Sequence, residues 1–216
     1  MKKIMFNDKY QLTKAVLEGR KTMTRRLIKP DYETVSCLNV NYEDHWHGEL
    51  DGETFDIIPR YEVGEVVAIA QSYKEIGLTF APYQDMTFQK KHVAQWGNTR
   101  SMKGWNNKMY VRADLMPHHI RITDIKMERL QDISREDCLL EGIEHDVADG
   151  AGLWWWDMED MKLQNELLRH EWNGKEGLWF WDTPQGAFAA LIDKINGKGT
   201  WNSNPFVFAY TFKLED

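Results

Sequence analysis

A short basic stretch near the N-terminus contains the residue types that could do chemistry. The chain has a formal net charge of -7, yet five cations lie close together here: Arg20, Lys21, Arg25, Arg26 and Lys29. Positive charge gathered on an acidic protein favours a site for an anionic or acceptor-rich ligand. A solvated basic turn would give the same pattern, so charge alone does not distinguish the two interpretations.

Within this stretch, Lys21 and Thr24 could act as a base and a nucleophile. A lysine serves as a general base only when its pKa falls, and burial together with nearby arginines has that effect. A threonine hydroxyl becomes a nucleophile when a base lies within hydrogen-bond reach. Residues 21 and 24 would face opposite sides of a regular strand. The pairing therefore requires a turn or bulge at Thr22 and Met23, just after Gly19.

The basic stretch is predicted to lie between a helix and a strand. A first strand is expected over 4–6, followed by Asp8 as an N-cap with Gln11 as its capping-box partner. An apolar stripe at helical spacing follows, and Gly19 is expected to end that helix in a left-handed conformation. The cations then run into a strand through 27–28.

Apolar periodicity and capping signals predict the remaining elements. Strands are expected over 63–70, over 120–127 with a bulge near Asp124, and over 206–212. Helices are expected from Ser134 to Gly142 and from Thr183-Pro184 to Gly197. Short strands separated by capped helices, without βαβ regularity, indicate an α+β fold: a small mixed β-barrel with flanking helices.

Three polar or irregular stretches interrupt this pattern. They are predicted to be large insertions into a single domain that spans 1–216, and they cover 31–58, 76–110 and 146–182. The last of them holds six of the ten tryptophans. These aromatics could form a base-stacking platform, but few basic residues interleave them, which favours a small hydrophobic subcore.

Composition limits the class of protein. A chain of 216 residues with a pI near 5.5 is large enough for one core and too acidic for sequence-blind binding to DNA. Two cysteines and no signal-peptide pattern predict a reduced, cytoplasmic protein with no membrane segment. The histidines near 45–47, 118–119 and 170 lack a second ligand pair at the right spacing, so no metal site is predicted. Cys138, beside two leucines, is expected to be a buried apolar residue.

The spacing of Gly19, Lys21 and Arg26 resembles the G-x-K-x-x-x-x-R motif of ASCH domains, which belong to the PUA-like superfamily of small β-barrels. Further blocks look like ASCH proteins of phage and prophage type, in the family's order: residues 6–7, 64–65, 128–133 and 195–205. The resemblance covers the core of the chain and leaves out the three predicted insertions.

The resemblance implies an activity. One bacterial branch of ASCH proteins is an amidohydrolase that converts N4-acetylcytidine to cytidine and acetate with a lysine, a threonine and a glutamate. Lys21 and Thr24 match its Lys-Thr-x-Thr element, and Glu141 matches the place of its glutamate. This chain departs from the branch in its greater length and in having Arg25-Arg26 where the branch has one arginine. The residues expected to contact the substrate are Gly19, Arg20, Arg25, Arg26, Trp201 and Asn204.

The implied mechanism needs no metal or other cofactor. Lys21 would deprotonate Thr24 for attack on the acetyl carbonyl, Arg26 or backbone N–H groups would hold the oxyanion, and Glu141 would protonate the leaving amine. Lys21, Thr24, Arg26 and Glu141 are therefore expected to converge on one cleft. The alternative is a non-catalytic PUA-like module that binds RNA or a modified base, and a ribonuclease is a third possibility. The negative net charge favours a modified nucleoside or nucleotide over RNA as the partner.

Overall fold

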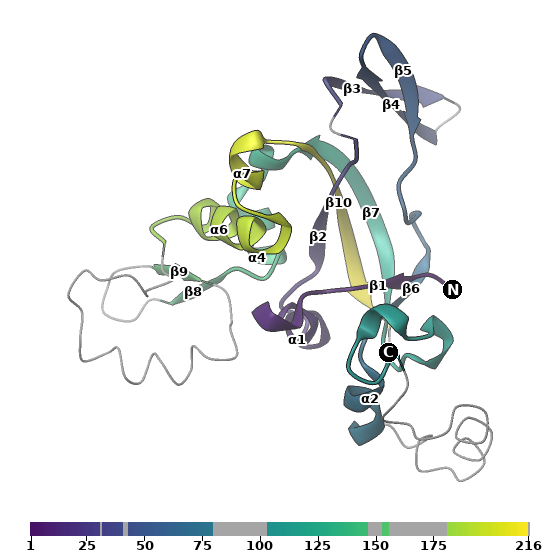
Figure 1. Ribbon diagram of the computed structural model, residues 1–216. Coiled ribbons are helices and arrows are strands. Elements are labelled where there is room, and N and C mark those ends of the chain that lie inside the picture. The colour runs from purple at the N-terminus through teal and green to yellow at the C-terminus, as the bar shows by residue number, and fades with distance from the viewer. Residues whose placement is uncertain (31, 41–42, 80–102, 147–152, 156–180, 216) are drawn as a thin grey trace.

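The computed structural model describes most of the chain, namely residues 1–30, 32–40, 43–79, 103–146, 153–155 and 181–215. At its centre is a five-stranded mixed sheet with the strand order β1-β6-β7-β10-β2 (Figure 1). Its strands are β1 (Lys3–Ile4), β2 (Met23–Leu27), β6 (Val66–Ile69), β7 (His119–Arg129) and β10 (Phe206–Leu214). β1 and β6 are parallel, whereas the other pairs are antiparallel.

The predicted mixture of helices and strands is confirmed, but the described strands do not close into a barrel. β1 and β2 are the two edges of the sheet and do not pair with each other. β1 offers only two paired residues, so it provides too little backbone to complete a closed ladder. The predicted barrel is thus an open sheet in the described part of the chain.

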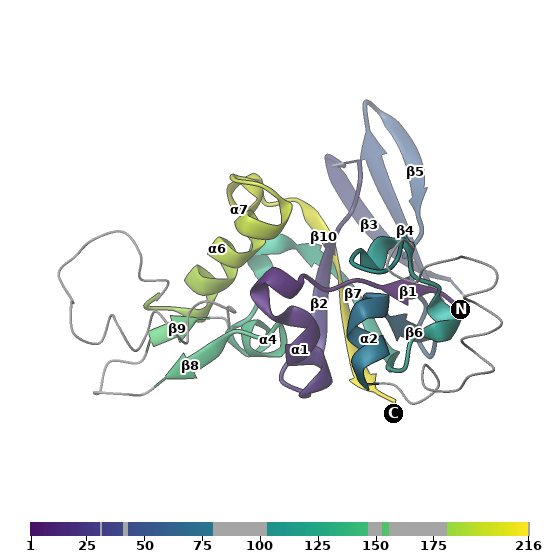
Figure 2. The same ribbon diagram turned by 60° about the horizontal axis from the view of Figure 1, so that its bottom comes forward.

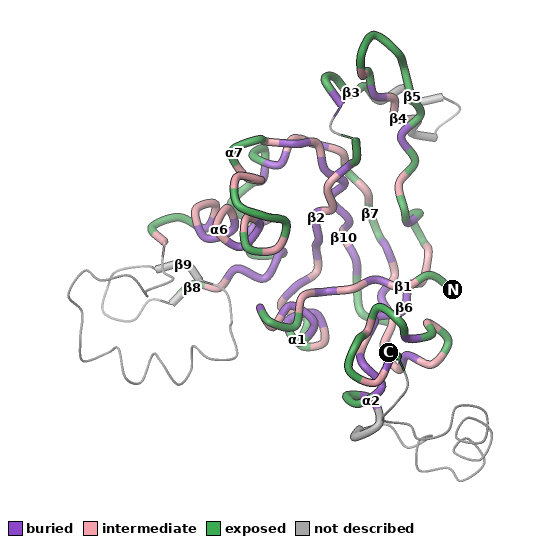
Figure 3. The backbone as a smooth tube through the Cα atoms, in the orientation of Figure 1, coloured by how far each residue is buried: buried purple, intermediate pink, exposed green. Residues whose placement is uncertain are grey.

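The predicted strands of the core are present because their sequences alternate or run apolar as buried strands require. In β10, Phe208 and Tyr210 are buried on one face and Val207 and Ala209 on the other. The predicted bulge near Asp124 also occurs: the pairing of β10 with β7 shifts between Thr211↔Asp124 and Phe212↔Ile122. Figure 3 shows the resulting buried residues along β2 and β10.

Residues 31–58, for which the sequence predicts no strands, contain a second sheet. Its three antiparallel strands are β3 (Thr34–Val40), β4 (Glu43–Leu50) and β5 (Glu53–Ile57), and it projects from one end of the central sheet (Figures 1 and 2). The polar and apolar residues of β5 alternate only over Thr54–Ile57, and four successive residues of the strand are exposed, so this run is too short to reveal it among polar neighbours. The Trp46 ring anchors the sheet edge-on against Phe208 at 5.3 Å.

Short helices surround the central sheet. They are η1 (Asp8–Tyr10), α1 (Leu12–Leu17), α2 (Tyr73–Thr79), η4 (Lys108–Tyr110), η5 (Ala113–Leu115), η6 (Leu130–Asp132), α4 (Arg135–Leu140), α6 (Pro184–Asn196) and α7 (Thr200–Ser203). A small hairpin of β8 (Glu144–Asp146) and β9 (Leu153–Trp155) follows α4. Both predicted capped helices are confirmed, because the Ser134 hydroxyl caps α4 and the Thr183 hydroxyl caps α6. Cys138 on α4 is fully buried, which raises the pKa of its thiol to about 12.

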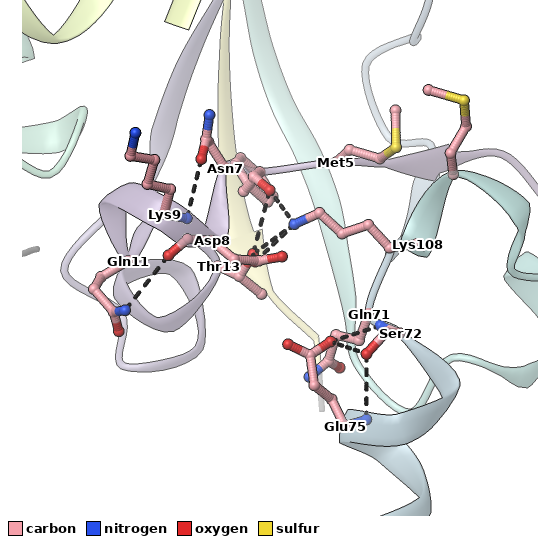
Figure 4. A network of polar contacts seen from close by, with 12 residues as sticks. Met5, Asn7, Asp8, Lys9, Gln11, Thr13, Gln71, Ser72, Glu75 and Lys108 are labelled. Atoms are coloured by element: carbon pink, nitrogen blue, oxygen red, sulfur yellow. Dashed lines mark hydrogen bonds and ion pairs between the residues drawn. The ribbon is translucent and has the colours of Figure 1, made fainter. Parts of the chain in front are cut away.

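The predicted cap of the first helix is wrong. Asn7, not Asp8, caps the turn η1, and Gln11 takes a left-handed conformation before α1 begins. The Asp8 carboxylate instead accepts hydrogen bonds from Thr13 and Lys108 (Figure 4). Lys108 also donates to the carbonyl of Phe6, so a residue about a hundred positions away fastens the segment that leads into α1. A local capping pattern cannot anticipate such a distant partner.

Gly19 follows α1 in the left-handed conformation that the sequence predicts, with φ 73°. Its N–H donates to the Val16 carbonyl, and the next two N–H groups both reach the Ala15 carbonyl. This turn brings Lys21 back toward the helix before β2 starts. Among the described residues, no helix is both long and apolar enough to cross a membrane.

Gly19→Ala should lower the free energy of unfolding by about 1 kcal/mol, because a Cβ makes the left-handed conformation unfavourable. No atom lies within 4 Å of the Cβ that alanine would add, so a clash contributes nothing to this cost. Gly19→Asn should cost less, since asparagine tolerates this conformation. Urea unfolding of both variants checks the prediction, and equal losses would contradict the conformational explanation.

Candidate active site

The structure brings Lys21 and Glu141 together, although they lie 120 positions apart in the sequence. The Lys21 ammonium donates to Glu141 Oε2 at 2.5 Å and to the Glu141 carbonyl at 2.7 Å. Both residues are buried, with exposed fractions of 2% and 4%. Glu141 ends α4, and Gly142 after it takes a left-handed conformation with φ 95°. A Cβ added at Gly142 would make an ordinary contact with the Lys21 Cβ at 3.5 Å.

Burial lowers the pKa of Lys21 from its ordinary value of 10.5, and the charges of Arg26 and Arg25 lower it further. Glu141 acts in the opposite direction through its charge and its hydrogen bond, without cancelling the fall. A buried lysine with a lowered pKa can exist as a neutral amine, which a general base requires. The fall predicted from the neighbouring arginines is present, but burial contributes more to it than they do.

Arg25 holds Glu141 in place through a buried cluster of carboxylates. Its guanidinium donates to Glu128 Oε1 at 2.6 and 2.9 Å, to Asp137 Oδ2 at 2.7 Å and to Glu141 Oε1 at 3.2 Å. Burial alone would lower the pKa of Arg25, but Glu141 and Glu128 outweigh it and keep that pKa above its ordinary value. The Arg25 guanidinium is thus bonded to carboxylates of β7 and α4, whereas the sequence predicts that it contacts the substrate.

A cavity of about 80 Å³ opens beside this cluster. Its polar wall contains five of the predicted site residues: Lys21, Thr24, Arg25, Arg26 and Glu141. The apolar wall comes mainly from α6, through Phe188, Leu191, Ile192 and Ile195. Among the described residues, the Thr24 hydroxyl has no hydrogen-bond partner, so it is available to a ligand. The predicted convergence of Lys21, Thr24, Arg26 and Glu141 is therefore observed.

The position of β2 at the edge of the sheet explains how neighbouring residues share one cavity. Thr24 and Arg26 pair with Tyr210 and Phe208 and lie on one face, whereas Arg25 lies on the other. Side chains from both faces of β2 nevertheless line the small cavity. The turn or bulge predicted at Thr22 and Met23 is wrong, because the turn lies at 18–20 and Met23 already belongs to the regularly paired β2. Lys21 follows that turn, and it still lines the same cavity as Thr24.

Arg26 separates the small cavity from a second cavity of about 460 Å³ and lines both of them. Its Nη2 donates to the Met5 carbonyl at 2.7 Å, while its buried Nε has no hydrogen-bond partner among the residues that the structure describes. Burial lowers the pKa of Arg26. The Arg26 guanidinium also lies 5.6 Å from the centre of the Phe6 ring, so it spans the two edges of the sheet.

The other predicted contact residues lie outside both cavities. Gly19 shapes the turn before Lys21 and is exposed. Arg20 forms ion pairs with Glu18 and Glu144. Trp201 packs edge-on against Phe188 at 6.2 Å, and the Asn204 side chain accepts from the Gln131 N–H at 2.8 Å. Trp201 and Asn204 thus support the core and the start of β10.

Most of the tryptophan-rich segment for which a hydrophobic subcore is predicted lies outside the described residues, including Trp156, Trp172 and Trp179. Trp181 is half-buried and packs against the main core. The Nδ1 of His47, from the histidine-rich segment, lies 2.9 Å from Oδ1 of Asp56. No cluster of three metal-ligating side chains occurs within the described ranges.

Sequence reasoning missed the carboxylate partners of Arg25 and most of the larger cavity. Glu128 and Asp137 lie in or beside blocks that resemble ASCH proteins, but nothing local shows that both face Arg25. Lys3, Arg60 and Tyr61 line the larger cavity from segments that carry no motif. Comparison of the chain with models of protein families, with curated proteins and with solved structures found no match.

Arg25→Met should destabilise the protein by about 3–5 kcal/mol, because it removes the buried guanidinium that bridges Glu128, Asp137 and Glu141. Urea unfolding measures the loss, and Arg25→Lys separates the need for a charge from the need for the planar guanidinium. Arg112→Met, which removes an exposed ion pair with Asp114, is the matched control and should change stability little. A similar loss in both methionine variants would refute the special role of Arg25.

Proposed function

We propose that this protein is an amidohydrolase of the ASCH type that removes the acyl group from N4-acetylcytidine or a related modified cytosine nucleoside. The observation that carries the proposal is the buried Lys21–Glu141 hydrogen bond beside the Thr24 hydroxyl in one cavity. These are three residue types that acyl transfer uses as base, acid and nucleophile. In this proposal the open sheet corresponds to a PUA-like barrel whose two edges frame the site.

The small cavity suits an acyl group. Its volume of about 80 Å³ is well below the roughly 300 Å³ at which pockets for whole small molecules begin. An acetyl group would place its methyl against the apolar wall of α6 and its carbonyl against Thr24. The remainder of the nucleoside would extend past Arg26 into the larger cavity.

The hydrogen bond between Lys21 and Glu141 allows one proton to serve both residues. With the proton on Glu141, Lys21 is a neutral base and Glu141 is an acid. Thr24 Oγ then attacks the acyl carbon while its proton passes to Lys21. The amide bond between the acyl carbon and N4 then breaks as Glu141 gives its proton to N4. This step releases cytidine and leaves an acyl ester on Thr24.

Water completes the cycle with the roles reversed. The Glu141 carboxylate takes a proton from water, and the resulting hydroxide attacks the ester carbon. Thr24 leaves with the proton held by Lys21, so the enzyme returns to its starting state and acetic acid is released. The unpartnered Nε–H of Arg26 is a candidate donor to the oxyanion in both steps.

Lys21→Met, Thr24→Val and Glu141→Gln should each lower kcat for N4-acetylcytidine by about 10²- to 10⁴-fold. Double variants should be hardly slower than single ones, because the three side chains act as a unit. Thr22→Val is the matched control, since Thr22 lines neither cavity. Chromatographic detection of cytidine measures the rates. Full activity of Thr24→Val would mean that water attacks directly, and binding without turnover by the unmodified protein would favour a module that only binds modified bases.

The pH profile of kcat/KM should rise along an acidic limb as Lys21 loses its proton. Because the pKa of Lys21 is lowered, the midpoint of that limb should lie below 10.5. Arg26→Gln removes a charge that lowers this pKa, so the limb should move to higher pH. Arg20→Gln should move it much less, because Arg20 is paired with Glu18 and Glu144 outside the cavity. A limb that stays in place in Arg26→Gln would show that Lys21 is not the titrating base.

A further inference from the structure

The larger cavity concentrates positive charge that the protein itself does not neutralise. Its lining includes four cations: Lys3, Arg26, Lys29 and Arg60. Within the described part of the chain, none of the four forms an ion pair with a carboxylate. Asp56 is the carboxylate in the lining, but its side chain is 79% exposed and bound to His47.

Three of these cations act on one another. Burial and the charge of Arg60 both lower the pKa of Lys3. The charge of Arg60 also opposes that of Arg26. Lys3 donates to the carbonyls of Met109 and Val111 at 2.7 and 2.6 Å, and these neutral acceptors orient the ammonium without cancelling its charge. The cavity therefore holds repelling cations that an anion would stabilise.

Two tyrosines fix the segments that carry these cations. The Tyr61 hydroxyl donates to the Lys3 carbonyl at 3.0 Å, and the Tyr210 hydroxyl accepts from the Arg60 N–H at 3.1 Å. The two rings pack edge-on, with their centres 5.3 Å apart, and the Arg60 guanidinium lies 5.6 Å from the centre of the Tyr61 ring. The positive site is thus held in place before any ligand arrives, which lowers the entropic cost of binding.

We propose that the larger cavity is a phosphate subsite, and that the ligand of this protein is a mononucleotide rather than an uncharged nucleoside. The proposal rests on the proposed function only for the base and the acyl group. A terminal phosphate carries nearly two negative charges and accepts paired hydrogen bonds from guanidinium groups such as those of Arg26 and Arg60. The volume of about 460 Å³ lies in the range that holds a small molecule. The net charge of -7 opposes an extended polyanion, so a single phosphate fits better than a nucleic-acid backbone.

Calorimetric titration with cytidine 5′-monophosphate and with cytidine tests the subsite without any turnover. The monophosphate should bind about tenfold more tightly than cytidine at low salt, and the ratio should shrink as salt rises. Arg60→Gln should reduce the ratio several-fold. Lys213→Gln, which removes an exposed lysine that lines neither cavity, is the control and should preserve it. Inorganic phosphate should compete with the monophosphate and not with cytidine.

Equal affinity for the two ligands, or no measurable binding of the monophosphate, would overturn the subsite. An oligocytidylate that binds more tightly than the monophosphate, with a steep dependence on salt, would overturn the choice of a mononucleotide. Hydrolysis of N4-acetylcytidine is measured separately. If the protein prefers the monophosphate but does not hydrolyse N4-acetylcytidine, the phosphate subsite stands and the proposed function is wrong. If it hydrolyses N4-acetylcytidine without that preference, the proposed function stands and the subsite is wrong.

Discussion

The buried guanidinium of Arg25 is the interaction on which the geometry of the site depends. It joins the edge strand β2 to β7 through Glu128 and to α4 through Asp137 and Glu141. Three carboxylates could not be held near one another inside a protein without a cation between them. By accepting from Arg25 on one oxygen, Glu141 is left with the other oxygen facing Lys21. The catalytic proposal therefore depends on a residue that has no chemical step of its own.

The open edge of the sheet is the second condition for a site. Had β1 and β2 paired, backbone hydrogen bonds would fill the space where the small cavity lies. Instead the Arg26 side chain reaches from β2 to the Met5 carbonyl and links the two edges. This arrangement keeps one wall polar while α6 supplies an apolar wall, and it lets the small cavity adjoin the larger one at Arg26.

Several elements could be predicted because their causes are local. Ser134 and Thr183 bond to backbone N–H groups three residues ahead, and Gly19 and Gly142 take conformations that disfavour other residues. In β10, aromatic residues alternate with smaller ones, and both faces of the strand are buried. The sheet of β3–β5 escaped prediction because β5 alternates over only four residues and is exposed along most of its length. The predicted cap at Asp8 failed because Lys108 competes for the same carboxylate.

For the site, the sequence alone determined which residues have the right chemistry and that the helix before them ends at Gly19. Gly19, Lys21 and Thr24 are close in the chain, so their arrangement follows from local backbone preferences. Only the tertiary structure decided that Arg25 is buried against carboxylates while Arg26 faces the cavities. The same holds for Lys3 and Arg60, which meet across β1 and the segment before β6. The carboxylate partners that bury Arg25 lie more than a hundred positions away in the sequence. No local pattern shows which of several similar cations will pair with such a carboxylate.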